Sequence, residues 1–340
     1  MAFENSAATD PKDLLQKLVI FLVANGWTSD RSAAEGLVGW TASLHKGAVY
    51  VHLRANLNEV VPFKNSTTDL GYSIAIYVGS GFSGGSPFFS QLVGAPIQSS
   101  DAAAPRGAVM TLLVTAIGNY FFFSDATGDN IVVVVEKSSG IFAHMGWGTS
   151  LSKIGTWTGG PYFFASSSGQ GGHSPSVGTT GHDLTASCMG IAGDDAAGCC
   201  TFVRAAVDAF DGWVSIGGSP IVGNPSFGYC GKLGASSVGG KGAGTDIRDQ
   251  IPSYMQIGTF LSAGAFQSSQ TSRMDGRANL LPCLLWALRD GSGAGYSPLG
   301  TIPNCFVCSG VGQGFAPKTD YAIGADTYTV FPNFAVKKTV

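Results

Sequence analysis

Charged residues are scarce in this sequence. Only 12% of its 340 residues are Asp, Glu, Lys or Arg, about half the share that is usual in soluble proteins. The formal net charge is −3, and no run of Lys or Arg occurs. Because basic runs are what attract a protein to nucleic acids and anionic membranes, we expect no nucleic-acid partner.

Long apolar segments are also missing. No stretch reaches the roughly 18 apolar residues that a membrane-spanning helix needs, so we expect no membrane insertion. The first residues lack the basic region, apolar stretch and cleavage site of a secretory signal. These features predict a protein that is made in a cytoplasm and either stays there or is released by lysis.

Catalytic motifs are not recognisable either. No nucleophile elbow, phosphate-binding loop or paired-carboxylate motif stands out in the sequence. Cys305-Phe-Val-Cys308 has the spacing of half a zinc site, but a structural zinc ion needs four ligands and no second such pair accompanies it. A redox role would require a thioredoxin-like strand–helix–strand setting, which the pattern lacks. We therefore expect no enzyme activity, no metal and no cofactor.

The five histidines are scattered, and two groupings could still support chemistry. Glu136 and His144 could form a general acid–base pair across a hairpin; the simpler expectation places Glu136 at a strand end and His144 on a partly exposed face. A second group could hold a metal ion in a glycine-rich loop, although such loop residues are more often simply solvated. It comprises His173, His182, Asp183, Asp194 and Asp195.

Seven cysteines are present, and an odd number cannot pair completely within one chain. Reduced thiols are the default in a cytosolic protein, and each cysteine could simply pack as a small apolar residue. Four of them have glycine-rich surroundings, where a disulfide within the loop or between subunits would restrain the chain. These are Cys188, Cys199, Cys200 and Cys230.

Strand patterns dominate the rest of the sequence. Tyr120–Phe123 and Ile131–Val135 are continuous apolar runs of strand length, and Asp125–Asn130 between them has the composition of a turn, with Gly128 free to adopt a positive φ. The runs do not alternate in polarity, so we predict a β-hairpin with both faces covered. Two further strands are predicted to follow it: Ile141–Trp147 and Trp157–Ala165.

One helix is predicted near the start of the chain. Asp10 is a favourable N-cap, Pro11 suits the first helical position, and Asn25-Gly26 is a typical left-handed stop. The helix should lie against the sheet or against a neighbouring subunit, and residues 1–9 should be a flexible lead-in. Its apolar stripe, the candidate assembly surface, consists of Leu14, Leu15, Leu18, Val19, Phe21 and Leu22.

Short apolar segments separated by glycine-rich stretches continue to the end of the chain. Residues 79–106 and 166–200 are predicted loops, and Met255–Leu261 could form a short helix. Further strand-like segments are Ala48–Leu53, Ser73–Val78, Met110–Ala116, Cys200–Val207, Gly212–Ile216, Asn279–Ala287, Tyr296–Ile302 and Thr327–Phe331.

The predicted fold is therefore mainly β. We expect antiparallel sheets in a sandwich or barrel-like arrangement, with one N-terminal α-helix and long Gly/Ser-rich loops. A domain boundary near residue 166 would divide a helix-plus-β domain (1–165) from a loop-rich β domain (166–340). One large domain would also fit the length of the chain.

Several stretches, in order along nearly the whole chain, resemble a family of structural proteins from tailed bacteriophages. They are Asp13-Leu-Leu15, Asn25-Gly-Trp-Thr28, His45–Val51, Gly71–Ile76, Asp129–Glu136, Phe142–Gly148, Gly155–Gly160, Ser297–Pro303 and Ile323–Pro332. The match is weakest between about 166 and 250. The resemblance implies a component of the phage tail or baseplate whose partners are copies of itself and other virion proteins. It carries no active-site residues.

These observations lead to one main expectation and two alternatives. The main expectation is a non-enzymatic structural protein that is assembled into the virion in the bacterial host cytoplasm. A receptor- or glycan-binding tail-tip module, with a host surface receptor as partner, would instead gather its six Trp and ten Tyr on one exposed face. A polysaccharide-degrading enzyme would need two carboxylates facing each other at roughly 5–10 Å, and the sequence offers no obvious pair.

Overall fold

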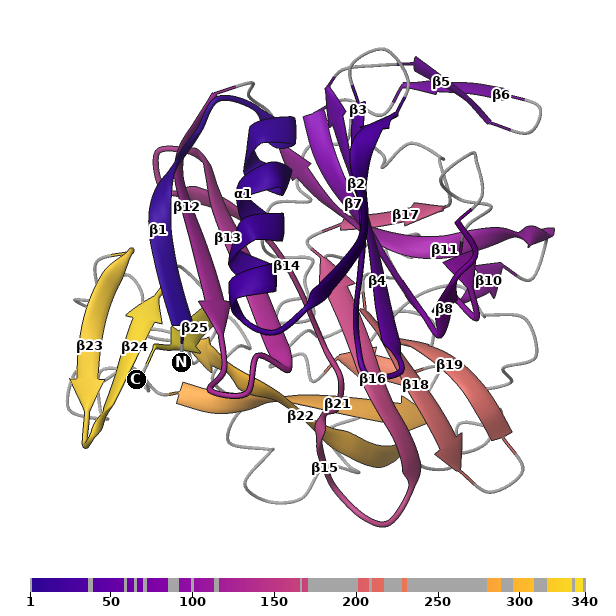
Figure 1. Ribbon diagram of the computed structural model, residues 1–340. Helices are drawn as coiled ribbons and strands as arrows, with labels where there is room; N and C mark the ends of the chain where they lie inside the picture. Colours follow the sequence, from indigo (N-terminus) through magenta and orange to yellow (C-terminus); the bar gives the residue numbers. More distant parts are fainter. Residues whose placement is uncertain are drawn as a thin grey trace, which may run out of the picture.

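The computed structural model confirms a mainly β fold with antiparallel sheets (Figure 1). Within its described residues there is one α-helix, and one parallel contact occurs, between Ile216 and Gly228. The described residues are 2–35, 39–57, 60–63, 66–69, 72–84, 92–98, 101–112, 116–165, 167–170, 201–207, 210–216, 228–230, 280–288, 296–308, 317–331 and 334–338.

The larger sheet begins with the N-terminal strand and ends with a C-terminal hairpin. A short strand, β15 (Ser152–Lys153), pairs with β22 beside this path. The strand order is β1 (Ala2–Ala8), β12 (Ile117–Ser124), β13 (Asn130–Ser138), β14 (Ile141–Gly148), β16 (Thr158–Ala165), β18 (Thr201–Val207), β19 (Phe210–Ile216), β20 (Gly228–Cys230), β21 (Leu280–Leu288), β22 (Tyr296–Cys308), β25 (Phe334–Lys337), β24 (Asp326–Val330) and β23 (Thr319–Ile323).

The smaller sheet is built mainly from the residues that follow the helix. Its order is β10 (Ile97–Gln98), β11 (Asp101–Leu112), β7 (Tyr72–Gly79), β4 (Val49–Leu57), β3 (Gly39–Lys46) and β2 (Thr28–Glu35), with β17 (Ser167–Gln170) paired to β11. Two short hairpins complete the described strands: β5 (Val60–Phe63) with β6 (Ser66–Asp69), and β8 (Gly81–Phe82) with β9 (Leu92–Val93).

The predicted hairpin is formed by β12 and β13, and both of its faces are covered, as expected. Alternate side chains of a strand point to opposite faces of the sheet. Tyr120 and Phe122 belong to a first core that lies between the two sheets, whereas Phe121 and Phe123 belong to a second core on the other face of the larger sheet. All four side chains are at most 5% exposed. Two buried faces explain why these strands are apolar without alternation.

The second core is closed by residues from the end of the chain. We call these residues the C-terminal layer: Ile302, Cys305, Phe331, Phe334 and Val336, all buried. The Phe331 ring lies 5.3 Å from the rings of both Phe121 and Phe142 in edge-on contacts. A second layer therefore covers the outer face of β12 and β14.

The predicted helix is α1 (Pro11–Ala24), and it lies between the two sheets (Figure 1). The Asp10 carboxylate accepts a hydrogen bond from the backbone N–H of Asp13 at 2.8 Å, which confirms the predicted N-cap. In the predicted apolar stripe, Val19 is half-buried and the other five residues are buried in the first core. The stripe thus packs against the chain's own sheets, so it is not a free surface for another subunit.

Two expectations about loops are wrong. Residues 1–9 are not a flexible lead-in, because 2–8 form β1, which pairs antiparallel with β12; the Asn5 side-chain amide also donates to the carbonyl of Tyr120 at 2.9 Å. The predicted loop 79–106 contains β8, β9, β10 and the first part of β11. Backbone pairing orders the described parts of both segments, although their sequences have little strand character.

The remaining fold predictions divide into those that overlap strands and those outside the described residues. The strand-like segments overlap β4, β7, β11, β18, β19, β21, β22 and β24. The helix suggested at Met255–Leu261 and the loop residues 171–200 lie outside the described part of the chain. Around the suggested boundary at residue 166, β16 pairs with β18 and β17 pairs with β11, so hydrogen bonds join strands from both sides of it.

Candidate functional site

The Glu136–His144 pair does not form. In the β13–β14 register Glu136 lies opposite Phe142, and His144 lies opposite Val134. The Glu136 carboxylate accepts hydrogen bonds from Asn119 at 2.7 Å and from the Lys318 ammonium at 3.0 Å. His144 is fully buried, so the expectation of a partly exposed face is also wrong. Its face is covered because the C-terminal layer packs on this side of β14.

Of the half zinc site, the structure describes the side chain of Cys305. Cys305 is a free thiol buried in the second core, and burial raises its pKa, so the thiol stays protonated and apolar. Among the residues that the structure describes, no group of three or more His, Cys, Asp or Glu could hold a metal ion. The suggested loop cluster around His173 and His182 lies outside those residues, as do Cys188, Cys199 and Cys200, so the disulfide hypothesis stays a prediction.

The most concentrated polar group is a layer on the outer face of the smaller sheet, which sequence reasoning missed. On β3, β4 and β7, apolar side chains face the first core and polar side chains alternate with them on the opposite face. The polar side chains are nevertheless buried, with at most 7% of their surface exposed. We call them the polar layer: Thr41, Ser43, His52, Arg54, Asn56 and Ser73.

Hydrogen bonds connect the members of the polar layer across neighbouring strands. Arg54 Nε donates to Asn56 Oδ1 at 2.8 Å, and the Asn56 amide donates to Ser73 Oγ at 3.0 Å. The Arg54 guanidinium also forms an ion pair with Glu35 at 3.3 Å. Buried polar groups must be paired to offset their lost hydration. The layer is therefore an internally bonded network that links β2, β4 and β7.

Ser43 and His52 have the separation of a nucleophile and its base. Ser43 Oγ lies 3.1 Å from His52 Nδ1, and both side chains are fully buried. Burial lowers the pKa of His52 to about 4, although a backbone hydrogen bond with Gly81 acts to raise it. The imidazole is therefore neutral at pH 7. The Phe82 ring of β8 lies 6.0 Å from this imidazole. A substrate could reach the serine only if its cover moved.

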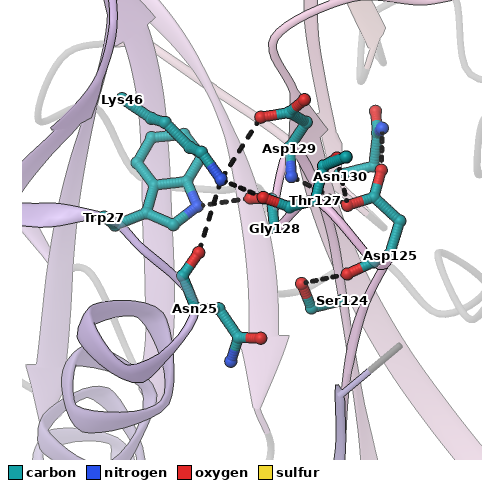
Figure 2. A network of polar contacts seen from close by, with 9 residues as sticks. All are labelled: Asn25, Trp27, Lys46, Ser124, Asp125, Thr127, Gly128, Asp129 and Asn130. Carbon is teal, nitrogen blue, oxygen red and sulfur yellow. Dashed lines mark hydrogen bonds and ion pairs between the residues drawn. The ribbon is translucent and has the colours of Figure 1, made fainter. Parts of the chain in front are cut away.

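A second polar network joins three segments that are distant in sequence (Figure 2). Lys46, at the end of β3, directs its ammonium at the carbonyls of Asn25 and Thr127 and at the Asp129 carboxylate, 3.3 Å away. The Trp27 indole N–H donates to the carbonyl of Gly128 at 2.8 Å. We call this network the junction, because it ties the end of α1 and the end of β3 to the β12–β13 turn.

The turn that enters the junction is organised by Asp125. Its carboxylate accepts hydrogen bonds from the Asp129 backbone N–H at 2.8 Å, from the Thr127 hydroxyl at 3.0 Å and from the Asn130 amide. Gly128 has the positive φ that was predicted, at 75°. With the Lys46 ammonium held by oxygens of Asn25, Thr127 and Asp129, the junction serves to hold the two sheets and the helix together.

Large aromatic side chains do not gather on one exposed face of the described structure. Trp27, Trp147 and Trp213 are buried. Trp40, on β3, and Trp157, just before β16, are half-buried. The Lys12 ammonium lies over the ring of Trp40, and the Lys153 ammonium lies over the ring of Trp157. Among the described residues, the large apolar side chains that are exposed are Ile20, Val23, Val93 and Ile154.

The sequence contains a pattern that indicates the polar layer: polar and apolar residues alternate along β4. His52, Arg54 and Asn56 alternate with Val51, Leu53 and Ala55 along one strand. Period-two alternation is normally interpreted as one buried and one solvated face. Here both faces are buried, and the pattern alone does not distinguish a solvated polar face from a covered one.

The two packed sheets, the enclosed helix and the buried polar layer define a β-rich protein of layered architecture. No protein-family model and no curated protein matches its sequence. In the described part of the chain no helix is long and apolar enough to cross a membrane.

Replacing Arg54 tests the polar layer. Arg54→Leu should lower the free energy of unfolding by about 3–5 kcal/mol, because it leaves the Glu35 carboxylate and the Asn56 amide without the guanidinium in a buried setting. Lys17→Leu is the matched control, since it breaks the more exposed Lys17–Asp13 pair, for which less than about 1 kcal/mol is expected. Urea unfolding with comparison of midpoints and slopes measures both. Equal losses would contradict a buried network.

Proposed function

We propose that this chain is a non-enzymatic structural component of a tailed-phage virion, in the tail or baseplate, where it packs against copies of itself and other virion proteins. The resemblance of stretches spread over nearly the whole chain supports this role. Low charge supports it as well, because 12% charged residues suits a chain whose surface is partly covered by other protein.

The observation that carries the proposal is the outer face of α1. The inner stripe of this helix is buried between the sheets, yet its outward side is also apolar: Ile20 is 70% exposed and Val23 is 50% exposed. The two residues are three positions apart, so their side chains are neighbours on the helix surface. A neighbouring subunit that covered them would remove apolar surface from water. The assembly role predicted for the helix is thus assigned to this outer pair.

The alternative of a receptor- or glycan-binding module has less support. Such a module would present its aromatic side chains on one exposed face, whereas three of the described Trp side chains are buried and the two half-buried ones lie apart in the chain. The Ser43–His52 pair gives an enzymatic alternative little support, because both residues are fully buried.

Quantitative mass spectrometry of purified particles tests the proposal. Phage particles released from the cells that make this chain should contain it in a fixed number of copies relative to the other virion proteins. A chain carrying Ile20→Asp should fold but be depleted from the particles, while Ile154→Asp, which alters an exposed apolar residue away from α1, should be incorporated normally. Absence of the wild-type chain from the particles would contradict the proposal.

A further inference from the structure

A buried histidine lies where the C-terminal layer packs on β14 and β16 of the larger sheet. His144 on β14 is fully buried, and its ring lies 5.1 Å from the ring of Phe334 on β25 and 6.2 Å from that of Phe164 on β16. The imidazole is therefore enclosed between the sheet and the layer that covers it. Aromatic side chains form much of the enclosure, and the other members of the second core are aromatic and aliphatic side chains with one cysteine.

Neither ring nitrogen of His144 has a hydrogen-bond partner. A buried polar group without a partner is unusual and destabilising, so its presence calls for an explanation. His45 shows the ordinary alternative: it is half-exposed, and its Nδ1 lies 2.8 Å from the Asp30 carboxylate, which would stabilise a positive charge. His144 has no such counter-charge in contact.

Among the residues that the structure describes, the other titratable groups facing the second core do not neutralise a charge on His144. From β13, Glu136 is bonded to Asn119 and Lys318; from β16, the Tyr162 hydroxyl donates to Asn130 Oδ1 at 2.9 Å; from β22, Cys305 is a protonated thiol. From β12 and β25 the facing side chains are Phe121, Phe123, Phe334 and Val336. An imidazolium at this position would be buried without a partner.

We propose that protonation of His144 releases the C-terminal layer from the part of the larger sheet that it covers, β12, β14 and β16, so that acid exposes the aromatic face beneath it while the first core stays folded. An imidazolium can regain water only if the side chains above it move away. On one side of the enclosure, β14 is paired with β13 and β16, and its opposite face packs in the first core. On the other side, β25 pairs with β22 and β24, so moving the layer away from β14 breaks none of these strand pairings.

The direction of the pH effect follows from the two protonation equilibria. Burial lowers the pKa of His144 to about 3, from an ordinary value of 6.5. The released state, in which the imidazole is hydrated, therefore binds a proton more readily than the closed state. Attachment is at full strength above about pH 6.5 and weakens as the pH falls toward 3, with the opening equilibrium constant rising about tenfold per pH unit.

Two other groups respond to acid and must be separated from His144. His52 in the polar layer has a pKa of about 4 and titrates over an overlapping range, but it lies on the smaller sheet. Burial alone would raise the pKa of Glu136, yet hydrogen bonds from Asn119, Gly140 and Lys318 lower it overall, so its attachment to Lys318 persists below its ordinary range. The location of the opening therefore identifies the responsible group.

Hydrogen exchange of the full chain, measured by mass spectrometry between pH 7.5 and pH 4 and corrected for the intrinsic exchange rate, tests the proposal. Peptides from β22 and β25 should lose protection about tenfold per pH unit below 6.5, and they should lose it at a higher pH than peptides from β4 and β7 do. His144→Phe should remove this pH dependence, and His144→Leu is a second variant in case the larger ring does not fit. His45→Gln, at a half-exposed histidine, should keep the wild-type profile.

Three results would overturn the proposal. The first is a wild-type chain in which β4 and β7 lose protection at the same pH as β25, since that is global unfolding. The second is opening of β4 before β25, which would assign the transition to His52. The third is a pH profile as steep in both His144 variants as in the wild type.

Discussion

Leu18→Asp should prevent the chain from folding. Leu18 is fully buried on the inner side of α1, between the two sheets. The substitution removes a core leucine, worth about 2–5 kcal/mol, and places a carboxylate in the apolar first core, where water is excluded. Together these effects approach the roughly 5–15 kcal/mol of stability that a typical domain has. Circular dichroism and urea unfolding of the purified variant measure the outcome.

Ile20→Asp is the matched control on the same helix. Ile20 is 70% exposed, so the same new charge stays hydrated, and a change within about 0.5 kcal/mol is expected. If Leu18→Asp and Ile20→Asp were equally stable, the helix would not lie between the sheets as described. The control also separates folding from assembly, because Ile20→Asp is expected to keep the fold and to lose only the proposed contact with neighbouring subunits.

Gly128→Ala should detach the β12–β13 turn from the rest of the junction. Gly128 has a φ of 75°, and a Cβ at this position would lie 2.0 Å from the carbonyl oxygen of Asn25 and 2.7 Å from the Lys46 ammonium. The backbone strain of an alanine there is about 1–2 kcal/mol. The overlap must also push the turn away, so that the bonds from Trp27 and Lys46 are lost at about 1 kcal/mol each. We therefore expect a loss of about 3–4 kcal/mol in urea unfolding.

Gly140→Ala distinguishes the overlap from the backbone strain. Gly140 also has a φ of 75°, but no atom lies within 4 Å of a Cβ built on it. Only the strain of about 1–2 kcal/mol is then expected. Similar losses for the two variants would mean that the turn moves freely and that the junction contributes nothing measurable. Trp27 fluorescence should respond to Gly128→Ala alone, because only that substitution disturbs the indole hydrogen bond.

The secondary-structure elements that could be predicted are those whose sequence signals, such as caps and turns, lie within a few residues of the element itself. Asp10 caps α1 and Gly26 ends it with a φ of 85°, as expected from local backbone chemistry. The hairpin of β12 and β13 was predicted from two apolar runs and a turn, with Gly128 at a positive φ. Uninterrupted apolar strands also implied two covered faces, because a solvated face would carry polar residues.

Where the pairing partner lies far away in the chain, the prediction failed. Residues 2–8 have the composition of a loose end, yet they form β1 because the edge of β12 provides backbone hydrogen bonds. Their partner is more than a hundred positions later, and nothing in the segment itself encodes that pairing. The described strands within 79–106 were missed as well, although their partners are nearby: β8 pairs with β9, and β10 pairs with β11.

The candidate site also combines features that the local sequence determines with features that depend on distant parts of the chain. The types of residue that make up the polar layer, and the alternation of His52, Arg54 and Asn56 along one strand, are properties of the sequence by itself. That this face is covered, that Glu35 meets Arg54, and that His144 is buried without a partner depend on which segments pack on the sheets. Local composition determined the helix, the turns and the strand periodicity, because those depend on backbone geometry within a few residues. Only the tertiary structure decided which faces are buried, because burial depends on residues that are remote in the chain.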